Sequence, residues 1–540
     1  MLLRRSLLAV SVPAIAFSLS AQSRSTTAVV NPAGVFYQRM AGPAMPSSGN
    51  DSVQGLRWTY PDANWITEKV SVGDHGSTAW LGQHVNNERY SVLSTTDYQP
   101  PAPLMEMQRL GSDWLYVKAA DKGPFAVTST VTSGASVVEF WSYSSPTPIW
   151  TLSIGQSCLV DISETGQIVA VGYSPTTTTA QIDVYDAFAG PAAPIAVLTA
   201  STHGLRQFDL SDDGSTVLMA THTDNHLFDV ATGQQIFQDG STVSHDAHAI
   251  DRDGSAWGRG GFNPVRAWVR SGNTYNQVLN FNDTTLGFAV FTAAGISNDG
   301  STFAAAAYDA QNGSFLRVYC WSLSPTSSTL LWSYASNGTG TLQTTPQAVS
   351  ISDDGSVIAV GSWGDSNNTH PEVLLFARNG NGTPLSSLDT PGSCFDLDLS
   401  GDGRFLVVGT KAVHANSFGR GGEGYSFDLG GLDFRLDGAV ATGRTVSLST
   451  EGAPGELVIL GFAGGLGAPT TILGIGGTLE LDLSRFFTNF VAGTIPASGP
   501  LVFPFAIPAI PSLAGHEFAV QAAHGAPFSF TNALRLPIAP

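Results

Sequence analysis

The chain has 540 residues, of which 12 % are charged and 42 % are hydrophobic, and its formal net charge is −19. This length exceeds a single ordinary core, so two or more domains are expected. The acidic balance excludes a nucleic-acid-binding surface, which needs clustered Lys and Arg, and the 59 glycines favour many short strands and turns over long solvated helices.

Residues 1–21 have the pattern of a signal peptide. Two arginines precede an apolar stretch from Leu7 to Leu19, and small residues follow, so we expect cleavage around Ser20 or Ala21. We therefore expect a secreted or cell-surface protein, with the periplasm as an alternative location. Residues 22–55 are rich in Ser, Pro and Gly and are interpreted as a linker or N-terminal arm. No later apolar run is long enough for a transmembrane segment.

Residues 56–431 contain a repeated unit in which an apolar strand enters an Asp/Asn/Gly turn and leaves as a second strand. The clearest copies are VDISETGQIVAVG (160–172), FDLSDDGSTVLMA (208–220), AGISNDGSTFAAA (294–306), VSISDDGSVIAVG (349–361) and LDLSGDGRFLVVG (397–409). The turn glycines of all copies are Gly76, Gly123, Gly166, Gly214, Gly254, Gly300, Gly355 and Gly403. Their spacings of 47, 43, 48, 40, 46, 55 and 48 residues indicate a β-propeller with one blade per period. We expect eight blades, or seven if the copy at Gly123 is irregular.

The order of strands within a repeat predicts how the propeller closes. The eighth repeat supplies a third strand, GYSFDLG (424–430), and no clear fourth. The segment LRWTYPD (56–62) has the form of the fourth strands PIWTLSI (148–154) and LLWSYAS (330–336), yet it precedes the first turn. We therefore expect this N-terminal strand to complete the last blade and leave no open edge.

Two features resemble known propeller families. The strand pair HLFDVATGQQIFQ (226–238) resembles that of WD40-like and YVTN-type repeats, and the resemblance places Asp229 and Thr232 in one turn. The tryptophan-bearing fourth strands resemble those of quinoprotein-type (PQQ-like) repeats. The quinoprotein resemblance implies a quinone-dependent oxidoreductase only where the cofactor residues are present, and the chain has no adjacent cysteine pair.

Residues 433–540 are expected to form a small antiparallel β-sandwich. Strand-like segments are RTVSLST (444–450), GELVILGF (455–462), GTLELDLS (477–484) and HEFAVQAA (516–523). The region resembles a C-terminal β-domain appended to many large secreted bacterial proteins. That resemblance implies export, sorting or surface retention, without catalytic residues.

The Asp-rich turns have two interpretations. Calcium prefers several carboxylate and carbonyl oxygens, but Asp and Gly are also the residues that a tight turn needs. No copy has the Asp-x-Asp/Asn-x-Asp/Asn-Gly spacing with a distal Glu that a calcium-binding loop uses. We therefore expect structural turns and predict no metal and no cofactor, with calcium as the alternative. The three cysteines, Cys158, Cys320 and Cys394, are expected to be buried thiols.

Ligands of propellers usually contact the loops that enter the first strand of a blade and those that join its second and third strands. The candidate ligand-binding residues on these loops combine imidazole, guanidinium, carboxylate and aromatic groups. They are His203, Arg206, His222, Asp224, His245, His248, Arg259, Trp363, Asp365 and Arg420. Loop residues without a ligand are the alternative interpretation for each of them.

We expect a secreted binding protein without enzymatic activity, whose partner is an extracellular protein or carbohydrate. The alternative is a propeller enzyme, either an extracellular glycan hydrolase or lyase or a quinone-dependent oxidoreductase, with its catalytic site among the loop histidines. An enzyme needs titratable groups that converge within hydrogen-bond reach. His203, His222 and His248 around one cavity would favour the enzyme.

Overall fold

The computed structural model describes three stretches of the chain. They are residues 28–31, residues 34–37, and residues 56–538 without 63, 74–75, 85–86, 96–102, 111–113, 202, 241–246, 312–314, 338–344, 366–369, 415–420, 430–433, 438–439, 451–454, 471, 473–474, 476–478, 485, 497–500, 515 and 526–527. Within them every element is a β-strand except the 3₁₀ turn η1 (Pro511–Leu513). The predicted all-β class is therefore confirmed. The described part of the chain has no helix with the length and apolar character that a membrane span requires.

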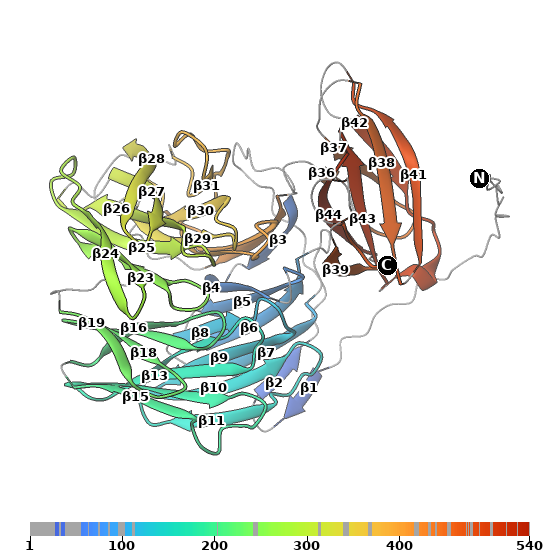
Figure 1. Cartoon of the computed structure of the whole chain (residues 1–540). Coiled ribbons are helices and arrows are strands. Elements are labelled where there is room, and N and C mark those ends of the chain that lie inside the picture. Colours follow the sequence, from blue (N-terminus) through green and yellow to red (C-terminus); the bar gives the residue numbers. More distant parts are fainter. Residues whose placement is uncertain are drawn as a thin grey trace.

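Eight antiparallel sheets follow one another along the described residues before Phe434 (Figure 1). We number them sheets 1 to 8 in the chain order of the strands β4, β8, β12, β16, β20, β25, β29 and β33, one of which lies in each sheet. Sheet 1 contains β4 (Ile66–Gly73), β5 (Thr78–His84), β6 (Asn87–Ser94) and β7 (Met105–Leu110). Sheet 2 contains β8 (Trp114–Ala119), β9 (Phe125–Thr132), β10 (Ala135–Ser142) and β11 (Trp150–Ile154). Sheet 3 contains β12 (Cys158–Ile162), β13 (Ile168–Thr176), β14 (Thr179–Asp186) and β15 (Ala196–Ala200). Sheet 4 contains β16 (Leu205–Leu210), β17 (Thr216–Thr221), β18 (Asn225–Asp229) and β19 (Gln235–Asp239).

The next four sheets have the same strand order. Sheet 5 contains β20 (His248–Ile250), β21 (Ala256–Arg259), β23 (Val265–Ser271) and β24 (Thr274–Phe281). Sheet 6 contains β25 (Ala289–Ile296), β26 (Thr302–Asp309), β27 (Phe315–Ser324) and β28 (Ser327–Asn337), with the short β22 (Gly261–Phe262) added beside β25. Sheet 7 contains β29 (Pro346–Ile351), β30 (Val357–Ser362), β31 (Val373–Ala377) and β32 (Ser386–Leu388). Sheet 8 contains β33 (Cys394–Leu399), β34 (Phe405–Thr410), β35 (Gly422–Asp428) and, from the N-terminal side, β3 (Leu56–Asp62).

The pairing of β3 with β35 matches the strand exchange expected from the sequence. Thr59 is the register partner of Tyr425, and the buried Trp58 donates its indole N–H to the backbone oxygen of Ser94. The guanidinium of Arg57 pairs with the buried carboxylate of Asp428. An N-terminal strand thus supplies the fourth strand of the last repeat sheet.

Part of the region predicted as a linker or N-terminal arm forms β-strands. Strands β1 (Ala28–Asn31) and β2 (Gly34–Tyr37) form an antiparallel pair, and β2 extends sheet 1 by pairing with β7. Valines and aromatic residues favour strands at these positions. The predicted signal peptide, residues 1–21, lies outside the described residues.

The first strands of consecutive sheets contact one another along the whole series. β4 contacts β8, β8 contacts β12, and the contacts continue through β16, β20, β25, β29 and β33. β33 also contacts β4, so the last sheet adjoins the first. Polar side chains link these strands: Asp161 accepts a hydrogen bond from the backbone N–H of Leu210 at 2.8 Å, and Asp398 accepts one from Val72 at 3.0 Å. These bonds satisfy backbone donors that an edge strand would leave unpaired.

The remaining strands form separate sheets with their own apolar core. One sheet contains β36 (Phe434–Asp437), β37 (Thr445–Thr450) and β42 (Leu501–Ala506), and another contains β38 (Leu457–Ala463), β41 (Phe487–Thr494), β43 (Glu517–His524) and β44 (Ser529–Pro537). A short pair contains β39 (Leu466–Thr470) and β40 (Leu479–Leu481). Their core includes Val446, Leu460 and Val520, and Figure 1 shows these strands beside the repeat sheets.

Candidate functional site

The two ends of each repeat sheet differ in their connections, and we name the ends accordingly. The turn end carries the glycine turns between the first and second strands. The loop end carries the connection from the second to the third strand and the connection into the next sheet. The described candidate residues all lie at or near the loop end, because they flank the ends of β17, β21 and β30 or the starts of β16 and β20. His245 and Arg420 lie outside the described residues.

Two of the candidate histidines lie side by side at the loop end of sheet 4. The rings of His203 and His222 are 6.4 Å apart, and both side chains are exposed. His203 Nδ1 lies 2.9 Å from the hydroxyl of Thr223, and that hydroxyl donates to Asp224 at 2.7 Å. Because the hydroxyl uses its hydrogen on Asp224, it accepts the Nδ1–H of His203.

The third histidine of interest, His248, is buried and has different contacts. Its Nδ1 lies 3.3 Å from Gln207 Oε1, and its Nε2 lies 3.1 Å from Asn225 Oδ1. Burial, together with the nearby Arg259 and Arg206, lowers the pKa of His248 to about 3. This imidazole is therefore neutral at pH 7 and lies between two amide side chains, whereas His203 and His222 face solvent.

A polar row crosses sheet 5 beside His248 at the loop end. Register pairs join His248 to Arg259, Arg259 to Arg266, and Arg266 to Asn280 on successive strands. Paired residues in an antiparallel sheet share one face, so these four side chains lie in one row. The row faces sheet 4, where Asn225 and Asp239 are themselves register partners.

The arginines of this row meet a single aspartate across the junction of the two sheets. Arg259 Nε donates to Asp239 Oδ2 at 3.1 Å, and Arg266 Nη1 lies 3.8 Å from Asp239 Oδ1. Arg259 has a side-chain exposure of 3 %, against 23 % for Arg266. Beside them is a pocket of about 510 Å³, which we call the seam pocket, lined by Asp239, Gly240, Arg259, Phe262, Asn263, Pro264 and Arg266.

Trp363 and Asp365 belong to a second group at the loop ends of sheets 7 and 8. The ammonium of Lys411 lies 5.2 Å from the ring centre of Trp363 and 5.5 Å from that of Phe395. Burial lowers the pKa of Lys411 below its ordinary value. Asp365 is fully buried, so it is not exposed for ligand contact as the sequence suggested.

A histidine–carboxylate pair lies close to Trp363 along the same loops. His414 Nε2 is 3.1 Å from Glu372 Oε1, and Glu372 also accepts the backbone N–H of Thr390 at 2.7 Å. Burial alone would lower the pKa of His414, but Glu372, the backbone oxygen of Thr390 and Asp389 together outweigh burial and raise the pKa. Lys411, His414 and Glu372 were not among the residues expected from the sequence, although Lys411 and His414 lie in the loop between β34 and β35.

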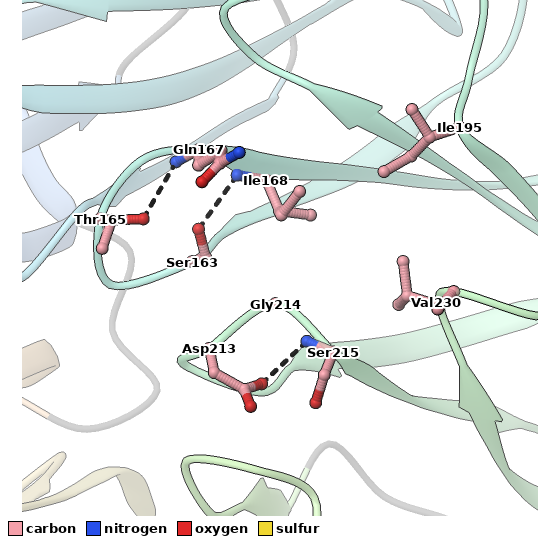
Figure 2. Close-up of a pocket in the computed structure, with 10 residues that line it drawn as sticks. Ser163, Thr165, Gln167, Ile168, Ile195, Asp213, Gly214, Ser215 and Val230 are labelled. Carbon is pink, nitrogen blue, oxygen red and sulfur yellow. Dashed lines mark hydrogen bonds between the residues drawn. The ribbon is translucent and has the colours of Figure 1, made fainter.

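The turn end contains a pocket of about 340 Å³ between sheets 3 and 4 (Figure 2). Its polar side chains are engaged by the turns themselves: Ser163 Oγ accepts the N–H of Ile168 at 3.0 Å, and Asp213 accepts that of Ser215 at 2.8 Å. Figure 2 shows Ile195 and Val230 on the opposite side of the pocket. Turn geometry thus accounts for the hydroxyl and carboxylate groups that line it.

The Asp-Gly turns repeat this arrangement in several sheets. Asp354 accepts the N–H of Ser356 at 2.9 Å and the hydroxyl of Ser352 at 2.8 Å. Gly355 has φ of +71°, a conformation that glycine adopts at little cost. In the described part of the chain, no group of three or more His, Cys, Asp or Glu side chains has the arrangement of a metal site.

Two further predictions for single residues are confirmed by the structure. Asp229 accepts the N–H of Thr232 at 2.8 Å, so the two residues share one turn as the repeat resemblance implied. The prediction of buried thiols is confirmed for Cys158, Cys320 and Cys394.

No family model matches the chain, and no curated protein sequence matches it. The loop-end residues described above are therefore the basis for assigning a function.

Proposed function

We propose that the protein is a secreted β-propeller that binds an extracellular carbohydrate or protein at its loop end. The eight repeat sheets would be the eight blades, and β3 would close the ring by completing the last blade. The contacts from β4 through β33 and back to β4 support this arrangement. The pattern of residues 1–21 supports export.

The observation that carries the binding function is the contrast between the two ends of the sheets. Backbone hydrogen bonds join neighbouring turns at the turn end, for example from Glu164 N to Asp212 O at 2.7 Å and from Asp353 N to Gly401 O at 2.7 Å. The loop end instead presents exposed His203 and His222 together with the seam pocket. Polar loops held on a rigid scaffold are the usual place for ligand contacts.

The C-terminal sheets are proposed to retain the protein at the cell surface or to support its export. Strands β41 and β42 are edge strands of their two sheets. Several large apolar side chains on and beside them are exposed, including Phe486 at 62 %, Val491 at 59 % and Val502 at 54 %. No charged residue occurs between Phe486 and Leu513. An uncharged apolar edge of this kind is typical of a surface that another component covers.

A binding screen of the mature chain, residues 22–540, tests the proposal. Glycan arrays and soluble extracellular proteins serve as ligands, and metal content is measured on the same sample. A ligand should lose affinity for His203→Ala/His222→Ala and keep it for Thr165→Ala/Gln167→Ala, the matched pair at the turn end. Equal affinity for both variants and the wild type, or loss only in the turn-end pair, would place binding elsewhere.

A second candidate function is an extracellular glycan hydrolase or lyase. The His414–Glu372 pair favours it, because a histidine paired with a buried carboxylate can act as an acid or a base. His203, His222 and His248 do not share one set of contacts, which weakens the version of this hypothesis that uses the loop histidines. Turnover of a bound glycan that is abolished by His414→Gln would establish the enzyme and replace the binding function.

A further inference from the structure

We propose that the seam pocket between sheets 4 and 5 binds the carboxylate or sulfate group of an acidic saccharide. This inference rests on the proposed function, since it specifies the ligand class at the loop end. It concerns Arg266, Asn263 and Phe262 in addition to Arg259, the one lining residue that the sequence had suggested.

The charged side chains that line the seam pocket are mostly positive. Its lining residues include two guanidinium groups and one carboxylate, in a chain whose formal net charge is −19. Both arginines approach the same Asp239, and Arg206 adds a further positive charge that contributes to the low pKa of His248. A local excess of guanidinium on an acidic molecule attracts an oxyanion.

The two arginines differ in their burial and in how closely they contact Asp239. Arg259 is almost fully buried and is fixed by Asp239 and by the backbone oxygen of Gly260, which its Nη1 contacts at 3.3 Å. Arg266 is partly exposed, and its contact with Asp239 is long at 3.8 Å. Its Nε donates to Asn280 at 3.2 Å, so the guanidinium plane is oriented from one side. An oriented guanidinium with an exposed edge suits bidentate contact with a carboxylate or sulfate.

The other walls of the seam pocket include apolar side chains. Phe262 and Pro264 offer apolar surface, and the ring of Phe262 is supported by Phe288 at a centroid distance of 5.1 Å. The side-chain amide of Asn263 donates to the backbone oxygen of Asp283 at 2.8 Å, which fixes the loop that carries these residues. An apolar wall beside an oxyanion site fits a sugar ring bearing an acidic group. The pocket volume of about 510 Å³ is within the usual range for small-ligand sites.

The test measures binding of D-glucuronate to the mature chain, with uncharged D-glucose and inorganic sulfate as comparison probes. Titration is followed by calorimetry and by the total tryptophan fluorescence, to which Trp268 contributes with its ring 6.0 Å from the Arg259 guanidinium. Arg266→Gln removes the exposed charge. Arg266→Lys keeps a positive charge but lacks the planar guanidinium that can contact an oxyanion through two N–H groups. Arg270→Gln is the matched control, because Arg270 is an exposed arginine on the same strand, towards the turn end.

We expect glucuronate to bind more tightly than glucose and Arg266→Gln to weaken glucuronate about tenfold or more, the loss typical of a charge-assisted hydrogen bond. Arg266→Lys should retain part of the affinity, and Arg270→Gln should bind as the wild type does. Sulfate should compete with glucuronate at the same site.

The inference would be overturned by unchanged glucuronate binding by Arg266→Gln, by an equal loss in Arg270→Gln, or by equal affinity for sulfate and glucuronate, which would remove the saccharide from the assignment. A chain that binds a neutral glycan or a protein through His203 and His222, yet ignores glucuronate, would contradict this inference while leaving the proposed function intact.

Discussion

The turn end and the loop end of the repeat sheets use similar polar residues for different purposes. At the turn end, Asp213, Asp354 and their equivalents accept hydrogen bonds from nearby backbone and hydroxyl groups, and the same short motif recurs from sheet to sheet. At the loop end, the segments vary in length and place His203 in solvent, His248 between two amide side chains, and the Lys411 ammonium over two aromatic rings. Repetition therefore marks residues that build the scaffold, and the departures from it lie in the loops where we propose that a ligand binds.

The largest expected effect concerns the strand that joins the last sheet to the start of the chain. A chain beginning at residue 63 lacks β3, whereas one beginning at residue 51 retains it and loses only β1 and β2. Burial of Trp58 alone is worth about 3–5 kcal/mol, so the shorter chain should melt at a much lower temperature. Calorimetry of both chains checks this, and equal melting temperatures would remove β3 from the scaffold.

The turn end can be tested at its glycines. Gly355→Ala forces a left-handed backbone on alanine and places Cβ 2.5 Å from Thr302 Oγ1, so it should reduce the free energy of unfolding by about 2–3 kcal/mol. Gly233→Ala has a similar φ of +67° with no atom within 4 Å of the new Cβ, and should cost about 1 kcal/mol. Urea unfolding measures both, and a similar loss in the two variants would show that packing against Thr302 contributes nothing.

The buried imidazole at the loop end predicts a pH dependence. The pKa of His248 is about 3 in the folded protein, below its ordinary value of 6.5. The unfolded chain therefore binds the additional proton between these values, and stability falls as the pH decreases below 6.5. From pH 7 to pH 5 the loss from this group is up to about 2 kcal/mol.

His248→Gln isolates that contribution, because glutamine does not titrate. Urea unfolding at pH 7 and pH 5 should show a smaller difference for the variant than for the wild type. The same difference in both proteins would mean that His248 is protonated when folded or that another group controls this range.

The smallest expected effect separates ligand binding from stability. His203→Ala/His222→Ala removes two exposed side chains, so the free energy of unfolding should change by less than about 0.5 kcal/mol. Ligand affinity should nevertheless fall, as proposed above. A large loss of stability in this double variant would instead assign the two histidines to the scaffold.

Much of the scaffold was predictable from the sequence because its signals are local and repeated. Seven of the eight turn glycines have positive φ, while Gly123 does not, in agreement with its irregular motif. Even so, sheet 2 consists of four antiparallel strands in chain order, as sheet 3 does. The exchange of β3 could be anticipated from the missing strand of the last repeat.

The site was less predictable because it depends on contacts between loops distant in sequence. His226 is only four residues from His222 in the sequence, yet its Nδ1 contacts Gln235 inside sheet 4. The seam pocket depends on register: Arg266 joins the row because it is the strand partner of Arg259. His414 and Glu372 are 42 residues apart, and no local pattern links them.

A density map of residues 22–540 from crystallography or electron microscopy tests the proposed propeller most directly. We expect eight sheets of four or more strands around a common axis, with residues 56–62 paired to residues 422–428 and β33 beside β4. An open stack of sheets, or residues 56–62 paired with any other strand, would contradict it.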